Sequence, residues 1–161
     1  MKPTGRAPQR VVAFSKAECE YLLDEIKAMH QARWFHRRAI NSRPTVIGNT
    51  AADYYFCGQR QMPRDLHTYL SEIAPVVEGA KLGEICINRY DVGQYMPEHV
   101  DVARYRYNMV IALCESGDGL TIEGVFSADV AGEGVVFPAY SAPHEVPPAT
   151  QERYVVIFLY E

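Results

Sequence analysis

The sequence has no long apolar run and no excess of positive charge. No stretch of its 161 residues is long and apolar enough to cross a membrane as a helix, so we expect no membrane partner. The first residues lack the apolar core of a secretory signal peptide, so we expect a cytoplasmic protein. The net charge of −4 at pH 7 argues against general affinity for nucleic acid.

Cysteine is scarce, and its spacing excludes the common zinc-binding patterns. The four cysteines form no C-x-x-C pair; they are Cys19, Cys57, Cys86 and Cys114. Three lie in apolar surroundings, where we expect the reduced, buried thiols of an intracellular protein. The chain also lacks internal repeats, low-complexity segments and any dividing linker. We therefore expect a single domain over residues 1–161.

The first half of the chain is predicted to be a helical support. Residues 1–10 show no periodicity, and we expect a flexible tail there. Ser15 and Glu18 form a capping-box pattern, and apolar residues at helical spacing follow it. A second helix fits about residues 64–78. The helical support is thus predicted over residues 15–80.

A basic and aromatic cluster follows the first predicted helix and consists of Arg33, Trp34, Phe35, Arg37 and Arg38. Such a cluster is compatible with a nucleic-acid surface. More often, basic residues near the C-terminus of a helix offset its dipole. We adopt the second interpretation and expect no nucleic-acid partner.

From residue 84 onward the pattern changes to short β-rich runs separated by turn signals, among them Ser116-Gly117-Asp118-Gly119. Several short strands with frequent turns favour an antiparallel sandwich or jelly roll, here over residues 84–161. The predicted fold class is α+β and mainly β: a jelly roll, or double-stranded β-helix, buttressed by two N-terminal helices.

Three residues in this second half form a candidate metal site. His99 and Asp101 are two positions apart, so an extended strand places both side chains on one face. His144 follows another predicted strand. Two imidazoles and one carboxylate form the facial triad that suits non-haem Fe(II) and leaves coordination positions open. Each element alone arises often by chance, so the hypothesis depends on their combination.

Arg153 opens the last predicted strand, both faces of which are apolar. A buried guanidinium needs an anionic partner, and it binds a carboxylate through two parallel hydrogen bonds. That partner is either a nearby Asp or Glu in a structural ion pair, or a dicarboxylate cosubstrate held beside the metal. The sequence leaves both alternatives open.

Taken together and in order, these segments resemble the 2-oxoglutarate and Fe(II)-dependent dioxygenases, and within them the prolyl 4-hydroxylase-like branch. The segments are Tyr90-Asp91-Val92-Gly93-Gln94, His99-Val100-Asp101, His144-Glu145-Val146 and Arg153-Tyr154. The branch shows Y-x-x-G ahead of H-x-D, then H-x-V, then a basic residue. The resemblance covers about residues 84–161.

The resemblance implies a role for each matching residue. Fe(II) would be bound by His99, Asp101 and His144. Arg153 would pair with the distal carboxylate of 2-oxoglutarate, and Tyr90 would line the cosubstrate pocket; the alternative for Tyr90 is a core tyrosine. Family members often carry a hydroxyl residue or Trp where this chain has Ile157 and Leu159. We therefore expect fewer or differently placed cosubstrate contacts.

The implied activity is O2-dependent hydroxylation of an amino-acid residue, by analogy a prolyl residue, in a peptide or protein. Succinate and CO2 would be the co-products, and ascorbate would serve as reductant. The first alternative is the same chemistry on a free amino acid or another small molecule. The others are a cupin-like metal protein and a non-catalytic jelly-roll binding module.

Four residues are candidates for substrate contact. Arg104 and Arg106 follow the metal motif, at the expected mouth of the site. Tyr54 and Tyr55 lie in residues 45–60, a candidate lid. The alternatives are a solvated loop for the arginines and a strand with half-buried aromatics for the tyrosines. The sequence does not indicate the oligomeric state.

Overall fold

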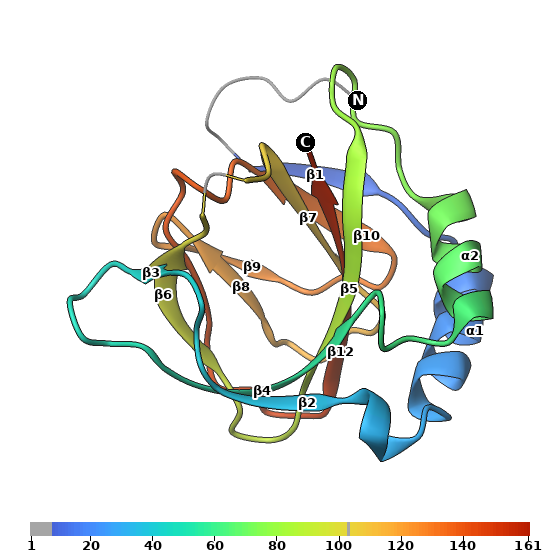
Figure 1. Cartoon of the computed structure of the whole chain (residues 1–161), viewed down its shortest axis with the longest axis horizontal. Coiled ribbons are helices and arrows are strands. Elements are labelled where there is room, and N and C mark those ends of the chain that lie inside the picture. Colours follow the sequence, from blue (N-terminus) through green and yellow to red (C-terminus); the bar gives the residue numbers. More distant parts are fainter. Residues whose placement is uncertain (1–7, 103) are drawn as a thin grey trace.

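Two antiparallel sheets face each other in the computed structural model, which describes residues 8–102 and 104–161 (Figure 1). The larger sheet has the strand order β1 (Gln9–Val12), β10 (Glu133–Phe137), β7 (Tyr107–Ala112), β12 (Arg153–Tyr160), β5 (Leu82–Tyr90), β4 (Ala51–Gly58) and β2 (Phe35–Ala39). The smaller sheet has the order β3 (Arg43–Pro44), β6 (Met96–Val100), β11 (His144–Val146), β8 (Gly119–Ile122) and β9 (Val125–Ala128). This is the predicted mainly-β jelly roll.

Two helices lie side by side against one face of the larger sheet (Figure 1). Helix α1 (Lys16–Lys27) begins with the predicted capping box: Ser15 Oγ accepts from Glu18 N at 3.1 Å, and Glu18 Oε1 accepts from Ser15 N at 2.8 Å. A short 3-10 turn, η1 (Gln31–Arg33), follows it. Helix α2 (Arg64–Ile73) ends earlier than predicted because the residue before Pro75 is extended. Among the described residues, no helix is long and apolar enough to cross a membrane.

Two predictions for the first half of the chain need correction. The predicted tail ends too late, because residues 9 and 10 belong to β1, where Arg10 pairs with Glu133 at 2.7 Å. The rest of that tail, residues 1–7, lies outside the described residues. The predicted helical support over residues 15–80 also contains strands β2, β3 and β4, which extend both sheets. The jelly roll is therefore not confined to residues 84–161.

Side-chain alternation along β12 separates the core from the interior of the roll. One face of the strand packs against the helices through Tyr154, Val156, Phe158 and Tyr160. The other face points between the two sheets and carries Arg153, Val155, Ile157 and Leu159. Because a strand sends successive side chains to opposite faces, one segment serves both the core and the wall of a cavity.

Candidate active site

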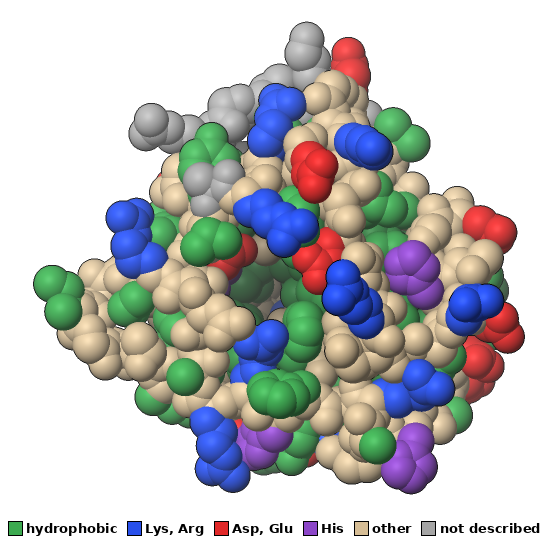
Figure 2. Space-filling view, in the orientation of Figure 1, with side chains coloured by type: hydrophobic (Ala, Val, Ile, Leu, Met, Phe, Trp, Pro, Cys, Tyr) green, Lys and Arg blue, Asp and Glu red, His purple; other side chains and the backbone are tan. Residues whose placement is uncertain are grey.

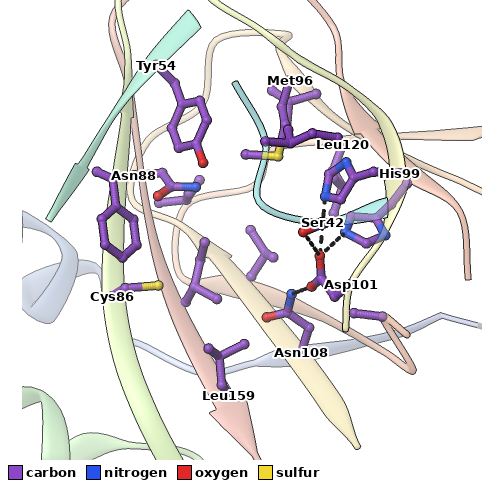
Figure 3. Close-up of a pocket in the computed structure, with 18 of the residues that line it drawn as sticks. Ser42, Tyr54, Cys86, Asn88, Met96, His99, Asp101, Asn108, Leu120 and Leu159 are labelled. Carbon is purple, nitrogen blue, oxygen red and sulfur yellow. Dashed lines mark hydrogen bonds and ion pairs between the residues drawn. The ribbon is translucent and has the colours of Figure 1, made fainter. Parts of the chain in front are cut away.

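The three predicted metal ligands meet on the smaller sheet (Figure 3). His99 on β6 lies directly opposite His144 on β11, and Asp101 follows the end of β6. Asp101 Oδ1 is 3.3 Å from His99 Nε2 and 3.6 Å from His144 Nε2. The candidate ligand atoms of all three residues lie within 4.8 Å of one another. The fold thus brings together two histidines that are 45 positions apart in the sequence.

Backbone carbonyls fix the orientation of both imidazole rings. His99 Nδ1 is 2.7 Å from the carbonyl oxygen of Pro97, and His144 Nδ1 is 2.8 Å from that of Ala142. A carbonyl oxygen only accepts, so each Nδ1 carries a proton and a neutral ring presents the lone pair of Nε2. These lone pairs converge on an oxygen of Asp101, which also only accepts when ionised. Three acceptors facing one another are a donor set that fits a divalent cation.

Asp101 is held by two further side chains. Ser42 Oγ donates to its Oδ1 at 3.2 Å, and Asn108 Nδ2 donates to its Oδ2 at 3.1 Å. Burial favours the neutral carboxyl, but when both rings carry a proton on Nε2, hydrogen bonds from His144 and His99 outweigh burial and hold the pKa of Asp101 well below its usual range. With the rings neutral, a cation would take the place of those protons. Asp101 is therefore a carboxylate at neutral pH, as a metal ligand must be.

A cavity of about 270 Å³ lies between the two sheets, beside the candidate ligands. Figure 2 shows the molecule hollowed near its centre, with charged and hydrophobic side chains around the opening. The walls are mostly apolar and include Met96, Leu120, Val155 and Ile157. An apolar cavity with a few converging polar groups is the usual form of a small-molecule site.

Arg153 lines this cavity from the opposing sheet and is only 1% exposed. Its guanidinium pairs with Asp129: Nε donates to Oδ2 at 2.5 Å and Nη2 donates to Oδ1 at 3.0 Å. Its third nitrogen, Nη1, is buried without a hydrogen-bond partner. The structural ion pair considered from the sequence thus exists, and it still leaves a donor for a second anion.

The Tyr90 ring contacts both Arg153 and Tyr54. The Arg153 guanidinium is 5.3 Å from the Tyr90 ring centre, and the Tyr54 ring stacks on Tyr90 with 5.7 Å between the ring centres. Burial raises the pKa of Tyr90 to about 12, although Arg153 opposes the shift. The hydroxyl therefore stays protonated at neutral pH and can donate to a carboxylate.

The two candidate substrate tyrosines face opposite ways. Tyr54 is buried in the cavity wall, and its hydroxyl points toward the cavity (Figure 3). Tyr55 points away from the cavity: its ring stacks on His36 at 4.5 Å, and the Arg89 guanidinium lies 4.1 Å above it. The expectation for Tyr55 is therefore corrected, because adjacent residues of β4 cannot share a face.

The two candidate substrate arginines do not line the cavity either. Arg106 Nη1 donates to the carbonyl of Gly79 at 2.9 Å, and the Arg104 guanidinium lies 5.1 Å from the ring centre of Tyr105. The cavity is lined instead by two neighbouring tyrosines, Tyr105 and Tyr107. Arg104 and Arg106 thus lie outside the cavity lining, and their contact with a substrate stays a prediction.

Several residues of the site escaped sequence reasoning: Arg37, Ser42, Asn88, Asn108 and Asp129. Asp129 has no sequence pattern that joins it to Arg153, which is 24 positions away. Arg37 was assigned to a helix end, whereas it lies on strand β2 and lines the cavity. Residues 35–39 show no clear alternation of apolar and polar side chains, so the sequence held no signal that would have placed the Arg37 side chain on an inner face.

Asp118 ties the loop before β8 to the segment that leads into Arg153. Its Oδ1 accepts from Thr150 Oγ1 at 2.9 Å, and its Oδ2 accepts from Gln151 N at 3.3 Å; both oxygens accept from Thr150 N at 3.0 Å. Burial opposes the charge of Asp118, but these hydrogen bonds outweigh burial and lower the pKa of the carboxyl. Asp118 thus holds in place the segment that leads into β12 and its cavity-lining residue Arg153.

Asp118→Asn is expected to lower the free energy of unfolding at pH 7 by about 1.5–3 kcal/mol, because hydrogen bonds to a charged acceptor are lost. A depressed carboxyl pKa stabilises the fold above its unfolded value, near 3.9, and that stabilisation disappears as the pH falls through the folded pKa. The difference in the free energy of unfolding between wild type and variant should therefore become smaller below about pH 4. Urea unfolding at pH 7 and pH 3 measures this difference, with the exposed variant Asp24→Asn as control. A difference in stability that does not change with pH would contradict the prediction.

Comparison with known proteins supports the fold but not a close relationship. No family model and no curated protein matches the chain. Among solved structures, a Pseudomonas putida prolyl-4-hydroxylase matches with a TM-score of 0.67 and 18% identity, over 97% of this chain and 92% of that one. A Trichoplax adhaerens prolyl hydroxylase, solved with a peptide fragment of hypoxia inducible factor, matches with a TM-score of 0.66 and 14% identity, over 95% and 82%.

A third structure shows that this fold is not restricted to hydroxylases. The non-heme alpha-ketoglutarate-dependent epimerase SnoN, from nogalamycin biosynthesis, matches with a TM-score of 0.70 and 11% identity, over 96% of this chain and 78% of that one. The predicted fold, that of the 2-oxoglutarate and Fe(II)-dependent oxygenases, is confirmed. At these identities the matches establish the fold alone.

Proposed function

We propose that this protein is a 2-oxoglutarate- and Fe(II)-dependent dioxygenase that hydroxylates an amino-acid residue, with a prolyl residue of a peptide or protein as the first candidate. One observation carries the proposal. The Nε2 atoms of His99 and His144 converge with the Asp101 carboxylate beside a cavity in which Arg153 keeps a buried, unpaired donor. A metal site next to an anion site is what a dicarboxylate cosubstrate requires.

Each part of the chain then has a defined task. The iron would be held by His99, Asp101 and His144, and the distal carboxylate of 2-oxoglutarate by Arg153 Nη1 and the Tyr90 hydroxyl. When bound, the iron, cosubstrate and O2 supply an oxidising chemistry that yields succinate, CO2 and a hydroxylated product. The apolar walls exclude water from this chemistry. We also propose that residues 1–161 act as one domain.

The nature of the substrate rests on weaker support than the class of reaction. The Pseudomonas putida and Trichoplax adhaerens neighbours are prolyl hydroxylases, and the second was solved with a peptide, which favours a prolyl substrate. The neighbouring epimerase shares the fold with a different activity, so fold alone does not identify the substrate. A free amino acid or another small molecule is the alternative. A cytoplasmic location and a role for ascorbate remain predictions.

Succinate formation is the experiment that tests the class. The protein is loaded with Fe(II) and 2-oxoglutarate without oxygen, exposed to air, and assayed for succinate against an iron-free control. We expect iron-dependent succinate even without substrate, and more succinate when a proline-containing peptide or free proline gains one oxygen atom. Iron retention without succinate would favour a non-oxidising metal protein. Loss of both would favour a binding module.

A further inference from the structure

Arg37 is a second guanidinium in the wall of the cavity. It lies on the edge strand β2, opposite Tyr54 of β4, and its side chain faces the cavity. The guanidinium lies 4.4 Å from the ring centre of Phe56 and 5.7 Å from that of Phe35. Its Nε is buried without a hydrogen-bond partner. The aromatic rings therefore support the face of the cation and leave its Nε–H group without a partner.

No acidic side chain in residues 8–102 and 104–161 forms an ion pair with Arg37. Asp53 is the acidic residue next to Tyr54 on the paired strand β4, and it faces the side of the sheet away from the cavity. It is bound there by His36 Nε2 at 2.6 Å and by Gln94 Nε2 at 2.9 Å. Two guanidinium groups thus line the cavity, and of these only Arg153 has a carboxylate partner among the residues that the structure describes.

This difference indicates two separate anion subsites. A buried donor without a partner is unfavourable, and a carboxylate ligand removes that penalty. Arg153 is already neutralised by Asp129 and can offer one N–H group to a cosubstrate whose other end is held by the metal. Arg37 forms no ion pair within the described residues, so it suits an anion that has no other strong anchor in the cavity.

We propose that Arg37 binds a carboxylate of the primary substrate, so that the substrate is an acid: a free or N-acylated amino acid, or the C-terminal residue of a peptide. The inference rests on the proposed function and favours a free acid or a C-terminal residue over an internal prolyl residue, since an internal prolyl residue has no carboxylate. Phe35 and Phe56, which flank the guanidinium, would cover the apolar part of the same substrate.

A matched pair of probes tests this subsite. N-acetyl-L-proline carries the carboxylate, and N-acetyl-L-proline N-methylamide replaces it by a neutral amide. Binding of each is measured by calorimetry to the protein loaded with Fe(II) and 2-oxoglutarate without oxygen. We expect the acid to bind wild type about 10–100-fold more tightly than the amide, as for a charge-assisted hydrogen bond. Arg37→Gln should reduce that preference to within about twofold.

Arg38→Gln is the matched control, because Arg38 is an exposed arginine and the next residue of the same strand. It removes the same charge and should keep the preference for the acid. Arg37→Lys keeps the charge and should retain part of the preference. If Arg37→Gln fails to fold, the wild-type comparison of acid and amide together with Arg37→Lys still decides the matter.

Three results would overturn the inference: equal binding of acid and amide to wild type, binding of neither probe, or an unchanged preference in Arg37→Gln. Loss of 2-oxoglutarate binding in Arg37→Gln with the acid preference intact would assign Arg37 to the cosubstrate instead. Failure of the proposed function looks different, because it appears as absent succinate formation by wild type, whatever the two probes do.

Discussion

His99→Ala is expected to abolish iron-dependent succinate formation and to weaken metal binding by more than about 100-fold. Mutations that only disturb the orientation of a ligand already weaken metal binding about 10–100-fold, and this change removes a ligand outright. His99 is one of three donors, and the remaining pair, Asp101 and His144, cannot form a facial triad. Metal content after gel filtration and succinate yield measure the two effects.

The control for this experiment is His67→Ala, which removes a histidine on helix α2, outside the cavity lining. It should leave metal content and succinate yield unchanged. Should His99→Ala retain both iron and succinate formation, the assignment of the metal site would be wrong. Full metal content with no succinate would instead show that His99 acts on the reaction and not on the binding of iron.

Arg153→Met is expected to lower the free energy of unfolding by about 3–5 kcal/mol and to abolish binding of 2-oxoglutarate. The stability loss arises because Asp129, whose side chain is only 7% exposed, would become a buried carboxylate without a partner. Such a loss is a large fraction of the stability of a domain of this size. Urea unfolding and calorimetric binding of 2-oxoglutarate provide the measurements.

The double variant Arg153→Met/Asp129→Asn separates the two roles of Arg153. Removing both charges should recover most of the stability, because no unpaired charge stays buried. Binding of 2-oxoglutarate should remain absent, since the donor Nη1 is gone. Recovery of cosubstrate binding in the double variant would show that Arg153 is only a structural residue.

The candidate metal ligands could be predicted from sequence in part, because the spacing of two of them has a local geometric meaning. A separation of two positions places His99 and Asp101 on one side of an extended segment. His144 lies beside them because it begins β11, which pairs with β6 in the smaller sheet. The capping box at Ser15 was equally local, since both of its hydrogen bonds join residues three positions apart. Such local patterns can be interpreted without knowing which strands pair in the folded protein.

The surroundings of the ligands could not be predicted, because they depend on pairing between distant strands. Asn108 reaches Asp101 from β7, and Asp129 reaches Arg153 from the segment after β9. Strands β2 and β3 were missed, and β4 was only the alternative to a lid, because a short aromatic run between two helices shows no clear period. Arg37 was misread for the same reason, and its role depends on strand pairing that only the folded sheet reveals.

Strand β12 is late in the sequence but central in the larger sheet, where it pairs with β5 on one side and β7 on the other. During synthesis, the edges of β5 and β7 that pair with β12 therefore stay unpaired until residues 153–160 have left the ribosome. Only then can the sheet close and the cavity wall that carries Arg153 form. Folding of the nascent chain thus depends on contacts between segments that are distant in sequence. Until these contacts form, exposed strand edges favour misassembly, which chaperones counteract.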